Sequence, residues 1–140
     1  MKSVVGTVML AGVLVCAGQQ LLLAQACQDD EDMAKSTIKD LADLIGAVKK
    51  ESMGDFEKAY HQKTFLSKSS FGLTVVSGLV DCLGKAAQDA TATKDQAAAY
   101  KTKEDSYAKL KGRMEQSRSA VKTADPKDAK ALIEKLDVST

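Results

Sequence analysis

Few side chains in this sequence could carry out acid–base or covalent chemistry. Its 140 residues include a single histidine, His61, and three cysteines. A histidine that acts as a general base or a metal ligand normally has a second histidine, a serine or a cysteine within reach. His61 has only Glu57, one helical turn before it, so we interpret it as a solvent-exposed helix residue.

Motifs that would supply catalytic partners are also missing from the sequence. It contains no HExxH, GxSxG, glycine-rich phosphate loop or Cys-x-x-Cys segment. The run Asp29-Asp30-Glu31-Asp32 offers oxygen ligands to calcium, but it lacks the spaced loop and the turn glycine of an EF-hand. We interpret it as negative charge that complements the dipole at the start of a helix. The sequence therefore predicts a protein that is not an enzyme and has neither a metal site nor a cofactor.

A basic segment is the strongest candidate for a contact surface. Residues 94–122 hold eight basic and four acidic side chains, a local excess of +4. Such a helix face could dock an acidic partner or an anionic surface, although interspersed acids are more typical of a face that is only solvated. The residues of this predicted basic docking face are Lys101, Lys109, Lys111, Arg113 and Arg118.

The first 26 residues have the pattern of a secretory signal peptide. Lys2 provides positive charge, residues 4–15 are apolar, and Ala24-Gln25-Ala26 is a small-residue cleavage signature. Cleavage after Ala26 would leave residues 27–140 as a single secreted domain of ordinary size. An uncleaved membrane anchor over residues 4–24 is the alternative, because that span is long enough to cross a bilayer. Either interpretation predicts an exported compartment.

Removal of this leader would take away Cys16 and leave two cysteines, Cys27 and Cys82. An even pair in an oxidising compartment predicts one disulfide. The bond would close a loop of roughly 55 residues and contribute about 4 kcal/mol to stability by restricting the unfolded chain. The alternative is lipidation of Cys27, which has a small residue before it but no aliphatic lipobox positions and would leave Cys82 as a thiol. We favour the disulfide.

The elements that must position these residues are predicted to be helices. Alanine and lysine are abundant and there is one proline. Apolar residues spaced by three and four predict a helix over residues 30–50 and a shorter one that follows Asp55 as its N-cap. Ser67, Ser69 and Ser70 then suggest a joint before a buried helix over 71–92. Three glycines in that segment leave a short strand at 73–76 as an alternative.

Two further helices are predicted towards the C-terminus. Residues 94–122 carry an apolar heptad seam with Lys103 and Ser117 at its two polar positions. Asp125-Pro126 has the pattern of an N-cap followed by proline at the first helical position. Together the segments predict an all-α, up-and-down antiparallel bundle of four to five helices. The apolar residues assigned to these two helices are Tyr100, Tyr107, Leu110, Met114 and Val121, then Ala129, Leu132, Ile133 and Leu136.

Composition and charge narrow the kind of partner. The net charge of +1 lacks the strongly basic character of a nucleic-acid-binding domain. We expect a secreted binding protein whose partner is another protein. Association with a membrane, through a lipid on Cys27 or through amphipathic helix faces, is a less favoured alternative. The identity of the partner and the oligomeric state stay open.

One segment resembles a known family. Leu79-Val80-Asp81-Cys82-Leu83, followed by Ala86, Ala87 and Ala90, is similar to a helix of the plant invertase and pectin methylesterase inhibitors. The resemblance implies a disulfide-stapled four-helix bundle that blocks a secreted cell-wall glycosidase or esterase by surface contact. Members of that family carry four cysteines, whereas two are expected here in the mature chain. Only the cysteine of this helix is therefore carried over from the family.

Overall fold

The chain folds into four α-helices in the part that the structure describes. The computed structural model covers the backbone of residues 12–50, 52 and 54–140, and the side chains of residues 27–50, 52, 54 and 58–140. The helices are α1 (Gly12–Lys50), α2 (Asp55–Ala87), α3 (Lys94–Thr123) and α4 (Pro126–Ile133). No strand occurs among these residues, and positions 73–76 lie inside α2. The predicted all-α class is confirmed.

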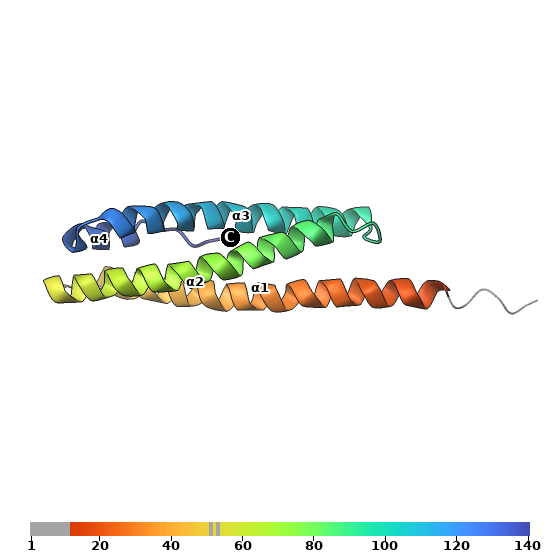
Figure 1. Cartoon of the computed structure of the whole chain (residues 1–140), viewed down its shortest axis with the longest axis horizontal. Coiled ribbons are helices and arrows are strands. Elements are labelled where there is room, and N and C mark those ends of the chain that lie inside the picture. Colours follow the sequence, from red (N-terminus) through yellow and green to blue (C-terminus); the bar gives the residue numbers. More distant parts are fainter. Residues whose placement is uncertain (1–11, 51, 53) are drawn as a thin grey trace, which may run out of the picture.

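The long helices run alternately in opposite directions (Figure 1). α2 lies at the centre and contacts α1, α3 and α4, while α4 folds back against the far end of α3. The N-terminal turns of α1 extend beyond the connection between α2 and α3. The bundle therefore consists of three long helices and one short one, within the predicted range of four to five.

The predicted joint at the serines is wrong, because α2 is one helix of 33 residues that includes both expected segments. Ser69 is fully buried, and its hydroxyl donates to the carbonyl oxygen of Leu66 at 3.3 Å. Thr74 likewise donates to the carbonyl oxygen of Ser70 at 3.2 Å. Hydroxyl groups that bond back to the preceding turn are accommodated within a helix. A small side chain at position 69 also continues the buried stripe that contains Phe65 and Val76.

Several predicted helix ends also differ from the structure. α1 begins at Gly12, so Asp29-Asp30-Glu31-Asp32 lies within the helix rather than at its start, and its first turn has no acidic residue. α2 begins at Asp55 itself, and the amide of Lys58 donates to the carbonyl oxygen of Gly54 at 3.1 Å. Gly54 thus occupies the position predicted for Asp55. α2 ends at Ala87 rather than near residue 92.

Two glycines of α2 allow close packing against α3. A Cβ atom on Gly72 would lie 2.8 Å from the terminal methyl of Met114 and 3.5 Å from the Thr37 methyl. A Cβ atom on Gly84 would lie 3.3 Å from a carboxylate oxygen of Glu104. These glycines weaken the helix propensity of α2, but they bring its backbone close to its neighbours.

The heptad seam of α3 is confirmed. Four of its five apolar residues are buried, and Tyr100 is partly buried beside them. Thr93 caps α3 in a reciprocal arrangement with Gln96, a capping box that the sequence pattern Thr-x-x-Gln could have revealed. The buried seam residues are Tyr107, Leu110, Met114 and Val121.

The start of α4 also matches the prediction. The Asp125 carboxylate accepts from the amide of Lys127 at 3.1 Å, and Pro126 follows it at the first helical position. Ala129 and Ile133 are buried, and Leu136 is buried just beyond the end of the helix. We call residues 134–140, which follow α4, the C-terminal segment.

Candidate functional site

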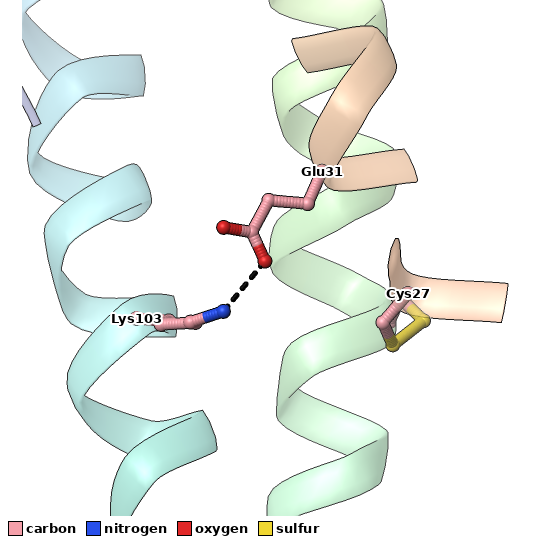
Figure 2. The surroundings of a disulfide bond; sticks show 4 residues. Cys27, Glu31 and Lys103 are labelled. Atoms are coloured by element: carbon pink, nitrogen blue, oxygen red, sulfur yellow. Dashed lines mark hydrogen bonds and ion pairs between the residues drawn. A yellow bond between two sulfur atoms is a disulfide. The ribbon is translucent and has the colours of Figure 1, made fainter. Parts of the chain in front are cut away.

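Cys27 of α1 and Cys82 of α2 form the covalent link of the bundle (Figure 2). Their sulfur atoms lie 2.02 Å apart and their Cα atoms 5.8 Å apart. Cys27 is buried, and Cys82 is partly buried on the side of α2 that meets α1. The structure thus places at bonding distance the two cysteines that the sequence analysis pairs.

An ion pair lies one helical turn further along α1. The Nζ atom of Lys103 on α3 is 2.6 Å from one carboxylate oxygen of Glu31, and the Nζ atom of Lys35 is 2.9 Å from the other. Glu31 is only 7% exposed. Cys27 and Glu31 are four residues apart and therefore share a face of α1. That turn is tied to α2 by the disulfide and to α3 by the ion pair, as Figure 2 shows. We call Cys27, Cys82, Glu31 and Lys103 the clasp.

The surroundings of the clasp shift the pKa values of Glu31 and of the neighbouring Tyr107. Burial alone would raise the pKa of Glu31, but hydrogen bonds and charge from Lys103 and Lys35 outweigh it and lower that pKa below its usual value. Burial and the nearby Glu31 carboxylate raise the pKa of Tyr107. The site therefore stabilises the ionised form of the Glu31 carboxylate, and this carboxylate holds α1 and α3 together. Both sulfur atoms are bonded, so neither acts as a nucleophile.

Sequence reasoning missed the ion pair, although one signal for it was present. Lys103 occupies a seam position of α3, and a lysine there needs an acidic partner or a path to solvent. The acidic run on α1 supplied candidates, but periodicity within single helices does not tell which of the four carboxylates faces α3. Only Glu31 of that run is buried.

The rest of the acidic run makes local contacts. Asp32 accepts a hydrogen bond from the side chain of Gln28 at 3.1 Å, while Asp29 is exposed. Within the described part of the chain, no three histidine, cysteine or acidic side chains gather as a metal ion would require. The helix-dipole interpretation of this run is wrong for the chain as it stands, because α1 begins well before it.

His61 is partly buried rather than exposed as predicted. It lies one turn before Phe65, which is fully buried, and therefore faces the same side of α2. Its ring meets Tyr60 edge-on, with centroids 5.5 Å apart. The neighbouring Gln62 donates to the carbonyl oxygens of Val121 and Ala124 at 2.8 and 3.0 Å. This stretch of α2 fastens it to the C-terminal end of α3.

Two of the predicted docking residues are engaged by acids on α3 itself. The Nζ atom of Lys101 lies 3.0 Å from a carboxylate oxygen of Glu104 and 3.0 Å from one of Asp105. The Nζ atom of Lys111 lies 3.8 Å from a carboxylate oxygen of Glu115. These exposed pairs within one helix contribute little to stability. They also reduce the local excess of positive charge that suggested a docking face.

The other three residues of the predicted docking face, Arg113, Arg118 and Lys109, lie in different environments. Arg113 donates from its guanidinium to the carbonyl oxygens of Asp137, at 3.0 Å, and Ser139. The Nε atom of Arg118 is buried without a hydrogen-bond partner among the described residues, and Lys109 is exposed. Since successive helix residues are rotated by about 100°, Lys109 and Arg113 flank one side of the buried seam and Arg118 the other. The five residues do not form one continuous face.

α2 also has the length and composition of a membrane span. A window of 18 residues within Lys58–Ala87 has a mean hydropathy of 1.2, and no other helix in the described part of the chain is as long and as apolar. α2 is nevertheless the helix on which the other three pack. This finding concerns length and composition only, and a core helix of a soluble protein passes the same test.

Comparison with known proteins found no relatives: no protein-family model, no curated protein and no solved structure matches this chain. The fold and the clasp by themselves define an all-α bundle with a disulfide-distance cysteine pair. The resemblance to the plant inhibitors stays a prediction.

Proposed function

We propose that this chain is an exported, non-enzymatic protein that binds another protein through the outer faces of its helices. The observation that carries the proposal is the clasp. Its cysteines are joined to each other and its buried carboxylate is paired with two lysines, so these groups hold helices together. A scaffold of this kind is suited to presenting a fixed surface.

Export is supported by the cysteine pair and by the shape of α1. Disulfides persist in oxidising compartments and are rare in the cytosol. The N-terminal turns of α1 extend past the α2–α3 connection (Figure 1). Cleavage after Ala26 would remove those turns and make Cys27 the first residue, while the clasp and the other three helices stay in place.

Exposed apolar side chains support a binding role. Met33, Tyr60 and Phe71 are 54%, 61% and 60% exposed, and all three belong to α1 and α2. Single exposed apolar residues are common on protein surfaces. Large side chains of this kind are nonetheless the usual anchors of protein interfaces. We therefore propose the outer side of α1 and α2 as the contact surface, in preference to the divided basic residues of α3.

Two measurements on the secreted protein test this function. Intact mass should correspond to residues 27–140 less two hydrogens, and a diacylglycerol adduct would instead support the membrane-associated alternative. Chemical crosslinking in the secreted fraction of the source tissue should capture a protein partner. Phe71→Ala should abolish the capture, whereas the matched variant Thr74→Ala, an exposed change on the same helix, should leave it intact. Equal capture by both variants, or turnover of hydrolase substrates that His61→Ala abolishes, would contradict the proposal.

A second candidate function is inhibition of a secreted carbohydrate-active enzyme, an invertase or a pectin methylesterase. It is favoured by the Asp81-Cys82-Leu83 segment, whose cysteine lies in the clasp on α2. The purified protein should then lower the activity of one of these enzymes in a dose-dependent assay. An excess of protein that leaves both activities unchanged would exclude this candidate without affecting the first.

A further inference from the structure

The C-terminal segment lies between α1 and α3 and leaves a hollow on each side of itself. Its chain end runs back beside α3 (Figure 1). The hollow towards α1 has a volume of about 480 Å³ and is lined by residues such as Ile45 and Val138. The hollow towards α3 has a volume of about 300 Å³. The volume of the hollow towards α3 is at the lower limit of the volumes of pockets that bind small molecules.

The hollow towards α3 has an apolar lining and one unsatisfied hydroxyl. Ala120, Leu132 and Leu136 are its apolar lining residues. Ser117 also lines it, and its Oγ atom is buried without a hydrogen-bond partner among the described residues. Buried polar atoms normally have such a partner, either in the protein or in a bound molecule. Ser117 is the second polar position of the heptad seam and is partly buried, and a hydrogen-bonding group in the hollow would satisfy its hydroxyl.

The charged residues around the hollow favour an anion. Lys135 lines it, is exposed, and makes no ion pair within the described part of the chain. Arg113 forms part of the wall and holds the C-terminal segment through two carbonyl oxygens. Asp137 is the one acid that lines the hollow, and its carboxylate accepts from the amide of Ser139 at 2.9 Å. Lys135 is therefore a cation without an ion-pair partner in this part of the chain, and Arg113 is a second cation whose hydrogen bonds go to uncharged carbonyl groups.

We propose that this hollow binds a small aliphatic carboxylate. The alkyl chain would lie against Leu132, Leu136 and Ala120, where it removes apolar surface from water. The carboxylate would pair with the ammonium group of Lys135 and accept a hydrogen bond from Ser117. The lining carries two cations, Arg113 and Lys135, and one acid, Asp137, so its net charge of +1 suits a ligand with a single negative charge, and the volume suits a short chain. The proposed protein contact on α1 and α2 does not involve these residues.

The test compares three probes with the same eight-carbon chain. Octanoate, octanol and octylammonium are titrated separately into the secreted, disulfide-bonded protein labelled with ¹⁵N, and backbone amide shifts are followed by NMR. Octanoate should give saturable shifts at Ala120, Leu132 and Leu136 and bind more tightly than the other two. Equal affinity for all three probes would overturn the proposal, because the hollow would then select only for apolar surface. Shifts that do not saturate, or that fall elsewhere, would overturn it as well.

Variants assign the roles of the two polar residues. Lys135→Met should weaken octanoate roughly tenfold, since it removes one charge-assisted contact, and should leave octanol unchanged. Ser117→Ala should weaken octanoate to a smaller extent. Lys109→Met, an exposed lysine of α3 outside the hollow, is the matched control and should bind octanoate like the parent. An equal effect of Lys135→Met and Lys109→Met would show that the response is to net charge and would reject the site.

Discussion

The two ends of the bundle are closed in different ways. At one end the clasp joins α1 to α2 through a disulfide and to α3 through an ion pair between Lys103 and the buried carboxylate of Glu31. At the other end the short helix α4 and the C-terminal segment fill the space between α1 and α3, and hollows of about 300 and 480 Å³ flank that segment. At the clasp end, specific bonds hold three helices together. At the other end, where the non-helical C-terminal segment follows the short helix α4, hollows remain beside the segment.

This difference follows from the kind of contact at each end. A disulfide and a charge-assisted ion pair each fix the distance and direction between the two groups that they join. The C-terminal segment is held by the guanidinium of Arg113 on two backbone carbonyls and by the side chains of Leu136 and Val138. A segment without regular secondary structure has no continuous apolar stripe, so this one leaves hollows on both sides of itself. We expect the clasp end to be rigid and the α4 end to open first.

The largest effect is expected from removing the disulfide. Cys82→Ser in the secreted protein should lower the free energy of unfolding by about 4 kcal/mol, because the unfolded chain is no longer constrained by a loop of roughly 55 residues. Urea denaturation followed by circular dichroism measures the change. Ser77→Ala, a partly buried change on the same helix, is the control and should shift the midpoint little. If the two variants unfold at the same urea concentration, the disulfide does not hold the bundle together.

A smaller, pH-dependent effect is expected at the ion pair. Glu31→Gln should lower the free energy of unfolding at neutral pH by about 2 kcal/mol, since hydrogen bonds to a charged group are lost in a buried place. The native pKa of Glu31 lies below its usual value of 4.5, so the unfolded state takes up its proton first as the pH falls. The stabilisation by Glu31 is therefore complete above about pH 4.5 and is lost as the pH falls through the lowered native pKa.

Unfolding measured across the acid range checks this sign. The difference between the parent and Glu31→Gln should be constant near neutral pH and shrink below pH 4.5. Asp40→Asn, an exposed acid on the same helix, is the control. A difference that grows with acidity would mean that the native pKa of Glu31 is raised, and that burial outweighs the two lysines.

The smallest effect on the free energy of unfolding is expected at the α4 end of the bundle. Arg113→Ala removes the hydrogen bonds to the C-terminal segment, which should lower the free energy of unfolding by about 1 kcal/mol. The local effect should be larger than the global one, with faster amide hydrogen exchange in residues 134–140 and unchanged exchange around the clasp. Lys109→Ala should change neither. Faster exchange at both ends would show that the bundle opens as one unit, which would contradict the contrast between its ends.

The helical class and most of the core could be predicted from the sequence, because both depend on local spacing. Apolar residues at intervals of three and four mark the faces of α1, α3 and α4, and the aspartate–proline pair marks the start of α4. Ser67, Ser69 and Ser70 were misleading, since their polarity suggests a break between two helices. Buried inside α2, Ser69 satisfies its hydroxyl within the helix itself. Polarity alone did not reveal that.

Sequence by itself determined that the chain is helical and that Cys27 and Cys82 are the cysteines to pair if the leader is removed, since these follow from residue types and from spacing within one segment. Only the tertiary structure decided which acid of the 29–32 run meets Lys103, why Gly72 and Gly84 fit within α2, and that the basic residues of α3 are divided among separate environments. The physical reason is that contacts between helices depend on their rotation and depth of packing. The rotation and the packing depth of a helix are set by all of its neighbouring helices together, so they cannot be deduced from the sequence of one segment.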